Sequence, residues 1–127
     1  FGVTKDIEVE KERQSIDRFN ENHLANRKLL EFVINYAQRE KGYQVYLFQA
    51  PSPPLIQQFE APYSSTFNKD LNYLVEKTGV KIISANNTLL KDSDFYDLMH
   101  LNEFGRERYE ATFTQQLTDV ANDSFSQ

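Results

Sequence analysis

The sequence predicts an α/β fold with a parallel sheet and helical crossovers, incomplete in this chain. Three observations predict it: segments of helical and strand periodicity alternate, glycines follow two of the expected helices, and only two strand-like runs occur. Helical crossovers make the connected strands parallel. Two strands are too few for an independently stable sheet, so either residues 1–22 contain another strand or the chain is part of a larger domain. We expect a single partial α/β domain over residues 1–127.

The first half of the chain supplies one clear helix and one strand. Residues 1–22 are highly charged with a thin apolar series, which indicates a peripheral helical segment or a piece of structure separated from its partner. Apolar residues recur at helical spacing over 22–41, and Gly42 provides the stop. Residues 43–49 are rich in β-branched and aromatic types, which favours a strand.

The second half repeats the alternation. Prolines over 50–65 predict a long loop without regular structure. A helix should follow, capped by Ser65 or Thr66 and ended by Gly79, and residues 80–84 read as a short buried strand. After a loop over 85–101, Asn102 should cap a last amphipathic helix.

Composition narrows the function classes. The net charge is −5 and the basic residues are scattered, so no nucleic-acid partner is expected. No apolar run approaches about 20 residues, so no membrane span is expected. Cysteine is absent and the two histidines have no metal-ligand spacing, so no thiolate nucleophile or metal site is expected.

Asp97 and His100 are the residues most suited to chemistry. Side chains three apart share a face in a turn, so the carboxylate can accept a hydrogen bond from one imidazole nitrogen. The other nitrogen is then free to act as a base. The competing interpretation is structural, because an Asp ahead of a helix often caps a turn.

The surrounding residues add a family resemblance. Asp97-Leu98-Met99-His100-Leu101-Asn102, with an aromatic lead-in at Phe95-Tyr96 and a glycine at 105, resembles the last sequence block of the SGNH hydrolase superfamily, the GDSL-like esterases and lipases. The likeness is best over residues 80–118. It implies a flavodoxin-like three-layer fold, with Asp97 and His100 as the acid and base of a catalytic triad. It also implies that the Asn caps the final helix and that Gly105 permits close packing.

The family's other blocks are missing. No Gly-Asp-Ser nucleophile block and no Gly-x-Asn-Asp oxyanion block occur in the sequence. Ser52, which follows a predicted strand, is the local substitute, although the flanking prolines favour a turn role. We therefore expect the nucleophile to lie outside this chain, and the chain alone to hydrolyse esters poorly.

The leading hypothesis is the C-terminal part of a serine esterase or acyltransferase. Its substrates would be small-molecule, lipid or carbohydrate esters, as the resemblance implies. The alternative is a non-catalytic α/β interaction module, and a chance D-x-x-H in an unrelated domain is also open. Exposed sheet edges would favour self-association. His23 is expected at the surface or in a cap, and the acidic residues Asp92 and Asp94 in a solvated loop rather than a cation site.

Overall fold

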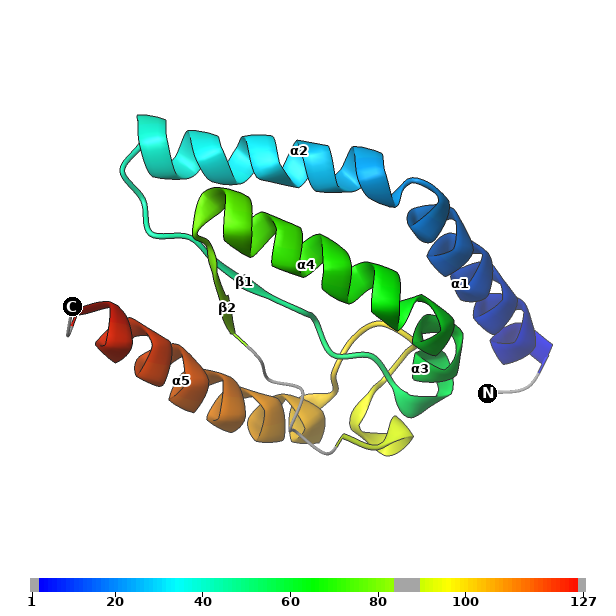
Figure 1. Cartoon of the computed structure of the whole chain (residues 1–127). Helices are drawn as coiled ribbons and strands as arrows, with labels where there is room; N and C mark the ends of the chain where they lie inside the picture. The colour runs from blue at the N-terminus through cyan, green and yellow to red at the C-terminus, as the bar shows by residue number, and fades with distance from the viewer. Residues whose placement is uncertain (1–2, 84–89, 126–127) are drawn as a thin grey trace. The chain divides into compact units, whose positions relative to one another are not determined.

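The computed structural model describes residues 3–83 and 90–125 (Figure 1). The helices and strands follow in the order α1 (Val3–Glu21), α2 (His23–Asn35), β1 (Tyr46–Phe48), α3 (Pro54–Glu60), α4 (Ser64–Thr78), β2 (Lys81–Ile83) and α5 (Glu103–Phe125). A π-helical turn (Tyr36–Glu40) extends α2, and short 3₁₀ turns occupy Ala61–Tyr63 and Asp92–Asp94. The two strands are neighbours in a two-stranded sheet.

The predicted fold class is wrong. The structure is 74% helical, its parallel sheet has only two strands, and no flavodoxin-like three-layer arrangement is present in the described residues. Within the described residues, the strand-like runs over 43–49 and 80–84 yield Tyr46–Phe48 and Lys81–Ile83, and residue 84 lies outside the described residues. A pair of strands this short presents too little sheet surface for helices to cover on both faces.

The segment predicted as an irregular loop contains a helix. Pro54 is the first residue of α3, where its missing N–H costs nothing and its fixed φ suits a helix start. Ile56 in this helix is buried. The prediction failed because it treated every proline as a breaker, whereas a proline in the first turn favours the helix that follows.

The predicted helices form close to their predicted bounds. Gly79 ends α4 in the left-handed conformation at φ 71°, as expected for a glycine stop. The predicted cap of this helix is wrong: Tyr63 occupies the N-cap position, and no side chain caps the first turn. The preceding 3₁₀ turn runs directly into α4, which leaves no extended residue for a serine or threonine cap.

The chain divides into two compact units, described separately. The first comprises residues 1–46 and 58–81, and the second comprises residues 47–57 and 82–127. In the first unit α2 and α4 pack side by side (Figure 1), with Ile34 and Leu74 buried. The Arg27 guanidinium lies 3.8 Å from the centre of the Tyr73 ring, and the Tyr73 hydroxyl donates to Glu31 at 3.1 Å.

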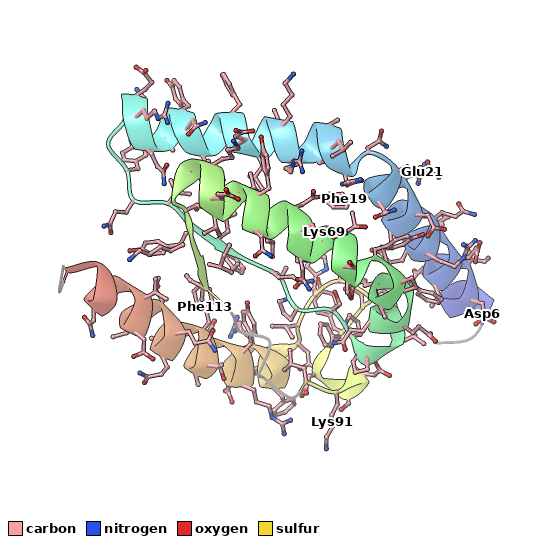
Figure 2. All side chains as sticks on the ribbon, viewed as in Figure 1. Asp6, Phe19, Glu21, Lys69, Lys91 and Phe113 are labelled. Atoms are coloured by element: carbon pink, nitrogen blue, oxygen red, sulfur yellow. The ribbon has the colours of Figure 1, made fainter. Side chains whose placement is uncertain are left out.

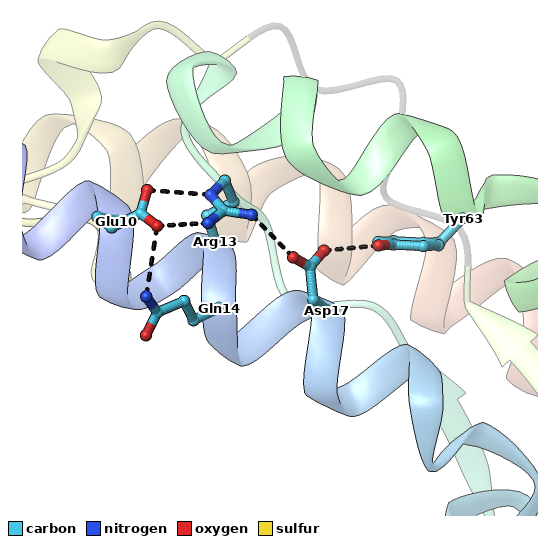
Figure 3. A network of polar contacts seen from close by, with 5 residues as sticks. All are labelled: Glu10, Arg13, Gln14, Asp17 and Tyr63. Atoms are coloured by element: carbon cyan, nitrogen blue, oxygen red, sulfur yellow. Dashed lines mark hydrogen bonds and ion pairs between the residues drawn. The ribbon is translucent and has the colours of Figure 1, made fainter.

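A polar network ties α1 to the turn before α4 (Figure 3). Arg13 pairs with Glu10 on one side and with Asp17 on the other, the latter at 2.9 Å. The Tyr63 hydroxyl donates to the second oxygen of Asp17 at 2.5 Å. This hydrogen bond to a carboxylate raises the pKa of Tyr63. Residues of α1 are thereby joined to a residue far along the chain within the first unit.

The second unit has a small core of its own. Ile56, Ile83 and Phe95 are buried. The rings of Phe48 and Phe113 meet edge to face with centroids 5.0 Å apart. This contact packs the end of β1 against α5. This core supports the loop between β2 and α5, on which the candidate site lies.

Candidate active site

Asp97 and His100 lie in a short loop that is closed at its base. Phe95 and Leu101 form an antiparallel bridge, and the Tyr96 N–H donates to the His100 carbonyl at 3.1 Å. The residues between these contacts have little freedom to open, because both ends of the loop are joined. The backbone therefore sets the positions of the two side chains.

The structure brings the predicted acid and base together. Asp97 Oδ2 lies 2.8 Å from His100 Nδ1, and Oδ1 lies 3.0 Å from the same nitrogen. The backbone N–H groups of Met99 and His100 each donate to Asp97 Oδ1 at 2.7 Å. One carboxylate oxygen thus closes the turn while the other orients the imidazole.

These contacts set the charge state of the carboxyl group. Partial burial raises the pKa of Asp97, but the hydrogen bonds from the Met99 N–H, from the His100 ring and from the His100 N–H together outweigh it. The pKa of Asp97 is therefore below its ordinary value. An ionised Asp97 at neutral pH accepts from Nδ1–H, which fixes the tautomer and leaves Nε2 as the basic nitrogen.

The imidazole is presented to solvent with one aromatic neighbour. The side chain of His100 is 59% exposed. Its ring stacks on Tyr96, with centroids 5.5 Å apart and planes inclined by 15°. Nε2 makes no hydrogen bond to any residue that the structure describes. A group approaching from outside therefore has access to this nitrogen.

The start of α5 packs closely against the 3₁₀ turn Asp92–Asp94. Asn102 caps the helix: its Oδ1 accepts the Gly105 N–H at 3.0 Å, and its backbone N–H donates to the Asp94 carbonyl at 2.8 Å. A Cβ on residue 105 would lie 2.2 Å from that same carbonyl oxygen, so only glycine fits there. The cap predicted at Asn102 is confirmed.

The other candidate residues lie elsewhere. His23 Nδ1 is 2.9 Å from Asp70 Oδ2, in a contact between α2 and α4. Ser52 is half-buried, its carbonyl accepts from Gln57, and no hydrogen bond among the described residues joins it to His100.

The acidic residues ahead of the site are structural. Asp92 accepts the Leu55 N–H at 3.1 Å. Asp94 is buried, accepts the Lys91 N–H at 2.8 Å and pairs with Arg108 at 3.4 Å. The prediction of a solvated acidic loop is therefore wrong for Asp94. Among the described residues, no group of carboxylates and imidazoles is arranged to hold a metal ion.

The pairing of His23 with Asp70 had no signal in the sequence. The partners belong to different helices, and no local spacing rule relates them. The stacking of Tyr96 on His100 was also missed. An aromatic residue four positions before a histidine, in a loop that returns on itself, is the signal that indicates it in retrospect.

Comparison with protein-family models, with curated proteins and with solved structures found no match. The resemblance to the SGNH superfamily therefore stays a prediction. None of the helices in the described residues is both long and apolar enough to cross a membrane.

Proposed function

We propose that Asp97 and His100 are the acid–base pair of a serine esterase or acyltransferase site of the SGNH kind, whose nucleophile lies outside this chain. The observation that carries the proposal is the 2.8 Å contact between Asp97 Oδ2 and His100 Nδ1, in a loop that leaves Nε2 accessible. The substrates would be small-molecule, lipid or carbohydrate esters, and no cofactor would be needed.

The chemistry follows from the orientation of the ring. His100 Nε2 takes the proton of a serine hydroxyl as its oxygen attacks the ester carbonyl, and then returns that proton to the leaving alkoxide. Asp97 stays ionised and stabilises the imidazolium that forms between these steps. The backbone hydrogen bonds at Asp97 Oδ1 support this role, because they keep the carboxylate charged and fixed.

The proposal has a direct test in the full gene product. Hydrolysis of a short-chain acyl ester is measured for wild type, His100→Ala and Asp97→Asn, with His23→Ala as the matched control. We expect losses of about 10³-fold or more for His100→Ala and of similar size for Asp97→Asn, with a wild-type rate for the control. An unchanged rate in His100→Ala would contradict the proposal. This chain by itself should show no substantial hydrolysis.

A second function is favoured by one specific contact. Asp97 Oδ1 accepts two backbone N–H groups, as a residue that only shapes a turn would. In that case the chain is a non-catalytic interaction module and the pairing with His100 serves the loop. Asp97→Asn separates the two functions, since the amide oxygen still closes the turn but does not stabilise an imidazolium. A folded Asp97→Asn variant with wild-type esterase rate would favour the module.

A further inference from the structure

Helix α2 carries an apolar surface on the side opposite its packing partner. Leu29, Phe32, Val33 and Tyr36 recur at the i, i+3, i+4 and i+7 spacing that places side chains along one stripe. We call these four residues the α2 stripe. Each is at least half exposed, and Phe32 is 68% exposed. The stripe lies on the far side of the helix from Ile34, which is buried against α4.

Exposure on this scale is unusual. Single exposed apolar side chains are common on protein surfaces, but a contiguous set of large ones at helical spacing marks a contact surface. A helix that is apolar on two opposite sides is normally covered on both. Figure 2 shows side chains projecting from α2 on the side away from α4, where no other described element of the first unit covers them.

Charge beside the stripe indicates what covers it. Lys28 and Arg39 lie roughly three turns apart, on the same flank of the stripe. Both are exposed, and neither forms an ion pair with a carboxylate of the described residues. Lys41 adds a third cation, 5.9 Å from the Tyr36 ring, and one exposed carboxylate, Glu40, lies four residues after Tyr36. On the α4 side, by contrast, Asp70 is already paired with His23 and Arg27.

This pattern disfavours two other occupants. Antiparallel pairing of two α2 stripes about their centre would bring Lys28 of one copy close to Arg39 of the other, and like charges repel. An anionic lipid surface is disfavoured because the chain carries a net charge of −5.

We propose that the α2 stripe is the docking surface for an amphipathic helix of a partner protein, one with an apolar face and carboxylates along one flank. The partner's apolar side chains interdigitate with Leu29, Phe32, Val33 and Tyr36. Its carboxylates pair with Lys28 and Arg39. This interaction uses no residue of the Asp97–His100 pair and does not depend on the function proposed for it.

Two synthetic peptides test the proposal. Each is a helix of about five turns with a leucine stripe, and the flank of that stripe carries glutamates in one peptide and lysines in the other. Binding to the whole chain is measured by fluorescence anisotropy at low salt. We expect the glutamate peptide to bind about tenfold tighter than the lysine peptide. Comparable binding of both, or of neither, would overturn the proposal.

Substitutions localise the binding. Phe32→Ser should weaken binding of the glutamate peptide about tenfold. Leu24→Ser should have little effect on this binding, because Leu24 is 57% exposed on the same helix but lies off the stripe. The double variant with Lys28→Glu and Arg39→Glu should reverse the binding preference, so that the lysine peptide binds more tightly. The pair Lys11→Glu and Lys69→Glu makes the same change of charge elsewhere and should leave the preference intact.

Three results would contradict the proposal. An unchanged preference in Lys28→Glu with Arg39→Glu would remove the charge argument, and this variant keeps the apolar stripe. Dimerisation of the chain that is lost in Phe32→Ser and blocks the peptide would assign the stripe to a second copy. Binding to phosphatidylserine vesicles in place of the glutamate peptide would assign it to a membrane.

Discussion

His23 and His100 each direct Nδ1 at a carboxylate, at 2.9 Å from Asp70 and 2.8 Å from Asp97, yet the two pairs differ in every other respect. The contact between His23 and Asp70 joins α2 to α4, and the Asp70 carboxylate also pairs with Arg27 at 3.3 Å. Asp97 and His100 lie in one loop, and backbone N–H groups occupy the remaining position on Asp97. The side chain of His23 is 30% exposed, against 59% for His100.

The difference shows why a histidine–carboxylate distance alone does not define a base. At Asp70 the carboxylate is shared between a histidine and an arginine from the facing helix. At Asp97 the carboxylate is contacted, among the described residues, by two backbone N–H groups and one imidazole. The first pair joins two helices, whereas the second presents an imidazole to solvent from a loop.

The largest effect is expected from Gly105→Ala, at the contact between α5 and the turn that precedes the Asp97–His100 loop. The added methyl would collide with the Asp94 carbonyl at 2.2 Å, and backbone atoms on both sides must shift. We expect a loss of about 3 kcal/mol in the free energy of unfolding. Urea denaturation measures it, and Thr114→Ala on the same helix is the control. Equal stability of Gly105→Ala and wild type would show that the turn and helix are not in tight contact.

Asp70→Asn should disturb only the contact between His23 and Asp70 and the neighbouring Arg27. The substitution leaves Arg27 and His23 facing a neutral group in a partly buried seam, where Asp70 is 16% exposed. We expect a stability loss of about 1–2 kcal/mol, larger than that of Asp97→Asn. Denaturation of both variants at neutral pH makes the comparison. A smaller loss for Asp70→Asn would invert the structural roles assigned to the pairs.

The lowered pKa of Asp97 predicts an acid-dependent contribution to stability. Because the folded-state pKa lies below the unfolded value, the contribution is fully present above that unfolded value and is lost as the pH falls through the folded one. Asp97→Asn should therefore reduce the stability difference between about pH 6 and about pH 3. Asp119→Asn, at an exposed position on α5, is the control. An identical pH dependence in Asp97→Asn and wild type would contradict the role of these hydrogen bonds.

Tyr96→Leu should have the smallest effect. The stacked ring on His100 is exposed, so its removal should cost about 0.5 kcal/mol or less. The change is better seen by NMR: the ring protons of His100 should lose the ring-current shift due to Tyr96, while those of His23 stay in place. Tyr96→Phe keeps the aromatic ring and serves as the control. Displaced His23 resonances would show that the substitution acts beyond the loop.

Local patterns in the sequence predicted more than long-range ones. Spacing rules describe features that depend on residues a few positions apart. Three such features were predicted: the contact between Asp97 and His100, the cap at Asn102 and the stop at Gly79. The helix begun by Pro54 was missed because proline has opposite effects at a helix start and in its interior. The sheet was overestimated because the length of a strand depends on its partners in space.

The π-helical turn Tyr36–Glu40 has a consequence for insertions and deletions. Its hydrogen bonds enclose one residue more than those of an α-helix, so the end of α2 holds one surplus position. Deleting Gln38 would leave an ordinary α-helical turn. Deleting Glu31 would rotate Phe32, Val33 and Tyr36 by about 100° relative to Leu29 and so take Leu29 out of the line of the α2 stripe. Changes of length along this helix should therefore be tolerated at its C-terminal turn and not at its centre.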